Sequence, residues 1–335
     1  GNAAKPARML VDCGSDAVAD MIAPRLSGNA SPLELFVLTH IDADHIGGVA
    51  KLFADRSLDD RYRDIWFNGW QQVNRFLGVR QGEQFSAILG DSKRHLPWNR
   101  SLRNGNEHPP PPVVIADGQR LPTFDLADGM RITLLSPRPS ELERLGRLWK
   151  EALLELAPRS GMLGRRRPLP AITDFSKFDV EALARAPTKK DPSAPNGSSI
   201  AFLAEYEGHT LLLTGDAHAD VLVESIRQLQ RERGVEGGRL KLDAIKLAHH
   251  GSAQATTLAL LDQVECSRYL VSSNGDIFDH PDREAIARVI VHGGERPTLC
   301  FNYRSALNAL WEERELRDRY RYDTVYPEEG QAGIR

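Results

Sequence analysis

The sequence has few cysteines, no long apolar run and little net charge, and each shortage excludes a class of protein. Among 335 residues there are three cysteines, an odd number without paired metal-type spacing, which fits a reducing compartment better than a disulfide scaffold. No apolar run approaches the ~20 residues that cross a bilayer, and the first residues lack the apolar core of a signal peptide. We therefore expect a cytoplasmic protein with no membrane partner.

The charge is nearly balanced, with 43 Lys and Arg against 46 Asp and Glu and a formal net charge of -3. Such a balance gives no global attraction to nucleic acid or to an anionic membrane, so any affinity of that kind must be local. The hydrophobic content of 41% is ordinary for a chain that buries a sizeable core. We expect a single domain over residues 1–335.

Short apolar runs recur along the chain, and each ends in a polar residue of a metal-binding type. Asp12 follows ARMLV, His40 follows a strand expected over 35–39, Asp216 follows LLLTG, and His249 follows IKLA. Loops beyond strand ends are where α/β sheets place their chemistry. Strands that alternate with helical segments, two of which begin near His218 and Ala255, predict an α/β fold built in layers.

The stretch from about 50 to 195 is the least regular part of the sequence, and we interpret it as an insertion between core motifs. It contains apolar runs typical of strands at DIWFNG and MRITLLSP and a proline-rich loop at HPPPPVV. SELERLGRLWKEALLELA has helical spacing, with Ser140 as a candidate N-cap and Glu143 three residues later. After this stretch, Glu207 and Gly208 separate two strands as a hairpin turn.

HIDADHIGG, which begins at His40, places four potential metal ligands in six positions: His40, Asp42, Asp44 and His45. Imidazole and carboxylate together suit zinc, manganese or iron, and two residues of each type are enough to start two adjacent metal sites. An acidic turn with Asp as a helix cap would be the alternative, but a cap does not explain the two histidines. Asp216, taken by itself, is equally compatible with a polar turn after a strand.

Taken in order, these motifs resemble the metallo-β-lactamase superfamily. HIDADHIGG, NGSSIAF, LLLTGD, KLAHHGS and SSNGDIFDHP are similar, more specifically, to the soluble hydrolase domain of ComEC-like competence proteins and their free-standing relatives. The similarity extends from Asp12 to His280, with little of it in the long middle stretch. It implies an αββα sandwich of the metallo-β-lactamase type, in which two mixed sheets pack face to face with helices outside.

The resemblance also implies roles for the ligand residues. His40 and Asp42 should hold one divalent ion and Asp44 and His45 the other, with Asp216 between the two ions. Asp44 and Asp216 thereby become catalytic as well as metal-binding. Zinc and manganese are the ions expected.

The remaining members of the implied site come from three other motifs. His249 is the preferred ligand to complete the second metal site, with His250 close behind it, although either histidine of the pair fits the motif. Asp12 should orient a ligand or a loop and is the weakest of the metal-ligand candidates. His280 is expected to donate a proton or contact phosphate, and it is equally compatible with loop packing.

Asn196 is where the sequence departs from the histidine-rich superfamily. It opens NGSSIAF and takes the place of the usual histidine, as in ComEC-like sequences. An amide oxygen is a harder and weaker ligand than imidazole, which predicts better tolerance of manganese or magnesium. A plain turn residue is the alternative. Ser252 and Asn274 are candidate substrate contacts, and Ser198 is a weaker one.

The resemblance implies a phosphodiesterase or nuclease, with nucleic acid or another phosphodiester as substrate. GRRRPLP and RLGRLWK in the insertion could contact phosphates, although such basic runs are more often solvated loops. A small-molecule hydrolase acting on an ester, lactone, thioester or cyclic nucleotide is the first alternative, with the insertion as a lid. A module controlled by a protein partner, with the insertion as its docking surface, is the second.

Overall fold

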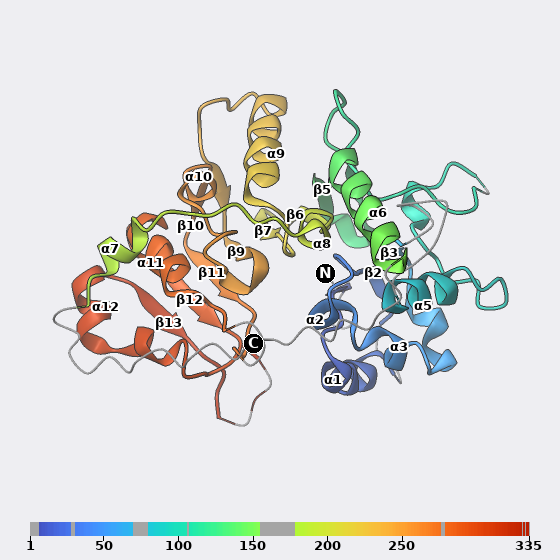
Figure 1. Ribbon diagram of the computed structural model, residues 1–335, viewed down its shortest axis with the longest axis horizontal. Helices are drawn as coiled ribbons and strands as arrows, with labels where there is room; N and C mark the ends of the chain where they lie inside the picture. Colours follow the sequence, from blue (N-terminus) through green and yellow to red (C-terminus); the bar gives the residue numbers. More distant parts are fainter. Residues whose placement is uncertain are drawn as a thin grey trace. The chain divides into compact units, whose positions relative to one another are not determined.

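The chain forms two compact units in the computed structural model (Figure 1). We call Gly1–Ala157 with Ser193–Phe202 the N-terminal unit, and Pro158–Pro192 with Leu203–Arg335 the C-terminal unit. Each is described by itself, and the single domain expected over 1–335 stays a prediction. The structure describes residues 7–27, 31–69, 80–105, 107–154, 178–275, 279–329, 331 and 333–334.

The N-terminal unit combines short parallel strands with helices. Its elements are β1 (Arg8–Val11), α1 (Asp16–Leu26), β2 (Leu33–Val37), α2 (Ala43–Ile46), α3 (Val49–Leu52), the 3₁₀ helix η1 (Arg56–Arg61), β3 (Ile65–Trp66), α5 (Arg80–Leu89), η2 (Arg100–Leu102), β4 (Thr123–Asp125), η3 (Ala127–Gly129), β5 (Arg131–Ser136), α6 (Pro139–Leu154) and α8 (Ala194–Gly197).

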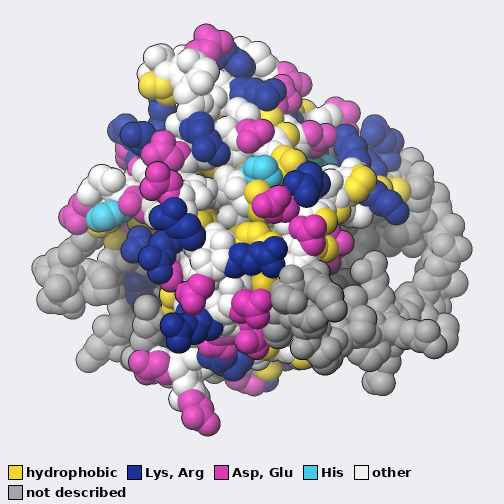
Figure 2. Space-filling model, turned by 90° about the vertical axis from the view of Figure 1, so that its left-hand side faces the viewer, with side chains coloured by type: hydrophobic (Ala, Val, Ile, Leu, Met, Phe, Trp, Pro, Cys, Tyr) yellow, Lys and Arg dark blue, Asp and Glu magenta, His cyan; other side chains and the backbone are white. Residues whose placement is uncertain are grey.

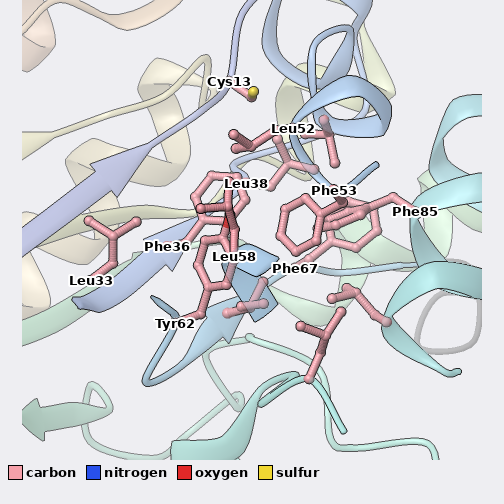
Figure 3. Packing of buried hydrophobic residues seen from close by; sticks show 14 of the residues in the cluster. Cys13, Leu33, Phe36, Leu38, Leu52, Phe53, Leu58, Tyr62, Phe67 and Phe85 are labelled. Atoms are coloured by element: carbon pink, nitrogen blue, oxygen red, sulfur yellow. The ribbon is translucent and has the colours of Figure 1, made fainter. Parts of the chain in front are cut away.

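A parallel sheet of order β1-β2-β3 lies at the centre of this unit. Its middle strand β2 is buried along nearly all of its length, which explains why its sequence is continuously apolar rather than alternating. Figure 3 shows the aromatic core on one face of the sheet, where the Phe53 ring stacks on Tyr62 at 4.9 Å and meets Phe85 at 5.1 Å. Side chains of α1, α3 and α5 belong to the same core, so these helices cover that face (Figure 1).

The other face of this sheet packs against further strands of the same unit. β4 and β5 are antiparallel, and the Trp66 ring of β3 lies 4.8 Å from Phe124 of β4 and 6.4 Å from Phe202. Trp66 is fully buried, and its indole N–H donates to the Asp64 carboxylate and the Ser101 hydroxyl. Strands therefore pack face to face here, with helices on the outer side of one sheet, as a sandwich requires.

The C-terminal unit is again a mixture of helices and mostly parallel strands. Its elements are α7 (Val180–Ala184), β6 (Ala201–Tyr206, in which the division between the units falls), β7 (His209–Leu213), α9 (Ala219–Glu232), β8 (Leu240–Leu242), β9 (Ala244–Lys246), η5 (Ala248–Gly251), α10 (Leu258–Leu261), β10 (Val264–Cys266), β11 (Arg268–Val271), α11 (Arg283–His292), β12 (Thr298–Phe301), η6 (Ala309–Glu312), α12 (Arg314–Tyr320) and β13 (Asp323–Val325).

The main sheet of this unit runs in the order β13-β12-β11-β9-β7-β6. β7, β9, β11, β12 and β13 are parallel to one another, so their carboxyl ends lie along one edge of the sheet. The loops after β7, β9 and β11 carry Asp216, His249 and Asn274, respectively. Parallel topology thus brings three of the sequence motifs to the same edge.

The expected α/β class is confirmed, while several element boundaries differ from expectation. β2 spans 33–37 rather than 35–39, and α6 begins at Pro139, so Ser140 lies inside the helix instead of capping it. The hairpin turn is as expected, because Glu207 and Gly208 both have positive φ, 47° and 84°. β3 pairs with β2, so part of the stretch 50–195 belongs to the core sheet.

Two further expectations concern a basic run of the insertion and the lack of membrane-spanning segments. The basic run GRRRPLP lies outside the described residues. Within the described part of the chain, no helix has both the length and the apolar character needed to cross a membrane.

Candidate metal centre

The HIDADH run lies at the carboxyl end of β2 and continues into α2. Asp42 occupies the N-cap position of α2, but its side chain makes no capping hydrogen bond there. Its carboxylate instead lies 3.5 Å from Nε2 of His40. A helix cap therefore does not account for Asp42.

Asp12 connects the end of β1 to Thr39 and to the HIDADH run through hydrogen bonds of its carboxylate. Its carboxylate accepts from the Thr39 amide at 2.8 Å and from the Thr39 hydroxyl at 2.9 Å. The same carboxylate lies 2.7 Å from Nδ1 of His45. An ionised carboxylate only accepts, so Nδ1 of His45 carries a proton, which leaves Nε2 as the nitrogen that can bind a metal. This is the contact by which a carboxylate orients a metal-binding histidine.

His40 and His45 present their rings side by side, with centroids 4.1 Å apart. Both side chains are 2% exposed or less. Nδ1 of His40 lies 3.0 Å from the Thr39 hydroxyl, and Nε2 of His45 lies 3.8 Å from the Asp44 carboxylate. Two imidazoles and two carboxylates thus lie within six consecutive residues. This donor set suits a divalent ion such as zinc or manganese.

Burial and these contacts act in opposite directions on the ionisation of Asp12. Burial raises the pKa of its carboxyl, but the His45 imidazole and the Thr39 amide bring the pKa below its ordinary value. The neighbouring thiol behaves differently, because burial raises the pKa of Cys13 to about 12. Cys13 therefore stays protonated at neutral pH and is no candidate nucleophile.

The segment that carries Asn196 lies against the end of β2 within the N-terminal unit. Asn196 is in α8 and is 2% exposed. The Ile200 amide donates to the Thr39 carbonyl at 2.9 Å, and the Ser199 hydroxyl lies 3.5 Å from Nδ1 of His40. Ser198 donates to the Pro195 carbonyl, so its hydroxyl serves the local turn.

In the C-terminal unit, Asp216 lies near both histidines of the HHG motif. Its carboxylate is 4.0 Å from Nε2 of His249 and 3.8 Å from Nε2 of His250. The His249 amide donates to the Gly215 carbonyl, which ties the loop after β9 to the loop after β7. Asp216, His40 and His45 are among the residues whose side chains can serve as metal ligands.

The two histidines differ in what their Nδ1 atoms face. Nδ1 of His250 lies 2.5 Å from the Ser272 carbonyl, which can only accept, so Nδ1 of His250 is the protonated nitrogen. Nδ1 of His249 lies 3.6 Å from the Asp191 carboxylate. Both residues have left-handed backbones, with φ of 48° and 54°.

The other candidates of this unit fall into two groups. His280 faces the loop of the HHG motif, with its ring 4.9 Å from the His249 ring and its Nδ1 3.4 Å from Asp282. Ser252 is buried, and its hydroxyl accepts from the Gln254 amide, so it shapes a turn. Asn274 is exposed. Their roles as substrate contacts stay predictions.

Sequence reasoning missed Thr39, Ser199, Asp191 and the supporting role of Lys246. Thr39 precedes the HIDADH run and looks like the last residue of a strand. Asp191 sits in the loop-like run TKKDPS, which has no periodicity that could single it out. Lys246 donates to the carbonyls of Leu247 and Gly215 at 3.2 and 3.5 Å; its place in a strand concealed that role.

Comparison with known proteins agrees with the class that these contacts suggest. The metallo-beta-lactamase superfamily model matches residues 7–71, the part of the chain that contains Asp12 and the whole HIDADH run. That part of the chain is therefore similar to a superfamily whose members typically bind divalent metal ions.

The particular structures that the chain resembles are distant. The metallo-beta-lactamase fold protein YhfI from Bacillus subtilis is 11% identical, with 97% of this chain and 85% of that chain covered and a TM-score of 0.38. A mutant of the CmlA beta-hydroxylase is 10% identical, with 90% of this chain and 46% of that chain covered and a TM-score of 0.34. No curated protein matches the chain. The superfamily match over residues 7–71 is thus the comparison that bears on the site.

Proposed function

We propose that this chain is a metal-dependent hydrolase that holds two divalent ions and cleaves phosphodiester bonds. The observation that carries the proposal is the Asp12 contact to Nδ1 of His45 at 2.7 Å. It places a proton on Nδ1 and leaves Nε2 as the nitrogen through which the imidazole can bind a metal. A histidine with a purely structural role does not need this tautomer.

The donor set fits the proposed ions in both units. His40 and Asp42 would hold one ion and Asp44 and His45 the other, and Asp216 of the C-terminal unit is proposed as a further metal ligand. When bound, such ions supply an activated water at neutral pH and stabilise the charge that develops on phosphoryl oxygens. Asn196, buried beside the end of β2, would complete the surroundings of the first ion.

We propose His250, rather than His249, as the histidine that binds metal in the C-terminal unit. The Ser272 carbonyl holds the proton on Nδ1 of His250 and leaves Nε2 toward Asp216. His249 has a carboxylate near each nitrogen, Asp191 at 3.6 Å and Asp216 at 4.0 Å. Its Nδ1 thus faces a carboxylate at a longer distance than the 2.5 Å contact that fixes the His250 ring.

The remaining residues would orient the reacting groups. We propose His280 as the proton donor or phosphate contact, with Asp282 3.4 Å from its Nδ1 orienting the ring. Ser199 and Thr39 hold the His40 ring from its Nδ1 side. No covalent nucleophile is needed, in keeping with the raised pKa of Cys13.

The choice of a phosphodiester as substrate rests on the ComEC-like motifs and on the donor set. Carboxylate and amide oxygens beside two imidazoles suit ions that handle phosphate oxygens. Figure 2 shows basic side chains interleaved with acidic ones over one face of the molecule. A charge pattern of this kind favours recognition in a confined site over tight binding along a broad surface.

The test combines metal analysis of the purified chain with assays on several substrates. Single-stranded DNA, duplex DNA, RNA and bis(p-nitrophenyl) phosphate are each incubated with added manganese or zinc. We expect hydrolysis of at least the small phosphodiester, and loss of it to background in Asp44→Asn. Asp20→Asn, which removes an exposed carboxylate paired with Lys51, is the control. Turnover of lactones or thioesters alone would refute the phosphodiester assignment.

A further inference from the structure

A groove of about 680 Å³ lies within the C-terminal unit, apart from the ligand residues just described. One wall is the segment 188–191, and the other is the outer face of α9. Val223 and Ala255 are among the apolar residues that line it. Its volume is that of a ligand-binding site. Of the side chains described for the candidate metal centre, only Asp191 also lines the groove.

The carboxylates Asp220 and Asp191 of the groove face basic side chains, whereas several cations of the groove have no ion-pair partner among the described residues. The Asp220 carboxylate is already paired with Lys190 at 2.7 Å, and the Asp191 carboxylate faces His249 at 3.6 Å. Among the residues that the structure describes, no carboxylate forms an ion pair with Lys189, with Arg227 or with Arg231. The groove therefore offers three cations whose charge is not locally neutralised.

Helical geometry places two of these cations in a row. Arg227 and Arg231 are four residues apart on α9, so they share one face of the helix. Both side chains are exposed, and the Arg227 guanidinium donates at 3.3 Å to the neutral amide of Gln263. Lys189 is exposed on the opposite wall. Glu224 lines the same groove and limits the net positive charge there.

We propose that this groove binds the phosphates of a single-stranded nucleic acid beside the one that is cleaved. The inference rests on the proposed phosphodiesterase function and adds a location and a substrate class. Asp191 belongs both to the groove wall and to the surroundings of His249, so the groove leads to the HHG loop within the same unit. Its confined volume suits a flexible single strand.

The lining of the groove also predicts how the strand is recognised. No Phe, Tyr or Trp is among the described side chains that line it, and the His218 ring that does line it is buried, so bases have no exposed ring to stack on. Lys and Arg contacts to phosphate carry no sequence information. Binding should therefore be indifferent to sequence and strongly dependent on salt concentration.

The experiment measures binding separately from catalysis. A fluorescein-labelled single strand of twelve nucleotides is titrated with the full chain in EDTA, and anisotropy is recorded over a salt series. Arg227→Gln combined with Arg231→Gln should weaken binding about tenfold and reduce the salt slope by about 1.4, since each phosphate contact to a single strand contributes about 0.7. Lys189→Gln, on the other wall, should reduce the slope by about 0.7.

The matched control removes the same charge elsewhere on the unit. Arg314→Gln combined with Lys241→Gln takes two exposed cations that do not line the groove, and it should bind like the wild type. All variants should keep the wild-type rate on bis(p-nitrophenyl) phosphate, which is too small to need the groove. Circular dichroism checks the fold of each variant. If the double arginine variant is misfolded, the salt slope of Lys189→Gln alone tests the groove.

The outcomes separate this inference from the proposed function. Equal weakening by groove and control variants, an unchanged salt slope, a preference for duplex, or no binding of the strand by the wild type would each overturn the groove. A wild type that binds the strand but hydrolyses no phosphodiester with any metal would overturn the function and leave the groove standing. We expect neither.

Discussion

Replacing Asp12 with Asn tests how the chain prepares His45 as a ligand. Asp12 has a φ of 63°, a conformation that Asn tolerates about as well as Asp, so the backbone should be retained. The amide keeps one oxygen for the Thr39 N–H. Its NH₂ group then faces Nδ1 of His45 and donates to it, which moves the imidazole proton to Nε2.

The magnitude follows from the contacts that change. The tautomer with Nε2 protonated cannot bind metal, so binding must first reverse it and break the new hydrogen bond. Removing a carboxylate that supports a metal-binding histidine typically costs 10–100-fold in affinity, or about 1.4–2.8 kcal/mol. The change leaves His40, Asp42 and Asp44 in place, so binding should weaken without being abolished.

Two measurements read the effect in metal-free and metal-loaded protein. Nitrogen chemical shifts of the imidazole report the His45 tautomer without metal, and competition with a chelator reports zinc or manganese affinity. Asp20→Asn, which also removes one exposed carboxylate, should change neither. An Asp12→Asn protein with wild-type affinity and an unchanged tautomer would show that Asp12 merely supports the fold.

The same variant has a consequence for stability at low pH. The pKa of Asp12 in the folded chain lies below its ordinary value, so its ionised form stabilises the fold above the unfolded pKa of about 3.9. That contribution is lost as the pH falls through the folded pKa. The unfolding free energy of metal-free wild type should therefore fall more steeply with acid than that of Asp12→Asn, as urea denaturation at several pH values would show.

Two further changes test the packing of the C-terminal unit. Arg288 is 1% exposed and donates to the carbonyls of Ala253, Thr256 and Ala186. Arg288→Met should therefore lower the unfolding free energy by roughly 3 kcal/mol, and Arg288→Lys should lower it less. Equal stability of the two variants in urea denaturation would contradict this. Glu207→Asn should raise the thermal midpoint, corresponding to about 1 kcal/mol, because Asn-Gly suits a turn with two positive φ values; an unchanged midpoint would count against the turn geometry.

Much of the ligand arrangement was readable from the sequence because it is local. HIDADH places four side chains within six residues, and the apolar run before it predicts the strand that delivers them. Chain direction then explains why Asp216 and His249 share a sheet edge, since β7 and β9 are parallel. The α/β class followed from the same alternation of strands and helices.

What could not be predicted are contacts that depend on tertiary geometry. Whether His249 or His250 presents Nε2 as a ligand depends on the Ser272 carbonyl, which belongs to the loop after β11. The segment 188–191 forms one wall of the groove along α9. The run TKKDPS that contains it has no periodicity from which this position could be predicted. The start of α6 was misplaced because Pro139, a favourable first residue of a helix, precedes the serine that resembles a cap.

At the consecutive left-handed residues His249 and His250, the residue type that is best for stability differs from the one that the proposed chemistry needs. A non-glycine residue in this conformation costs of order 1 kcal/mol or more, whereas glycine adopts it freely. A directed-evolution screen that scored only thermostability would therefore favour glycine at both positions and discard two imidazoles next to Asp216. Stabilising this protein for practical use means holding these two positions fixed and seeking gains elsewhere.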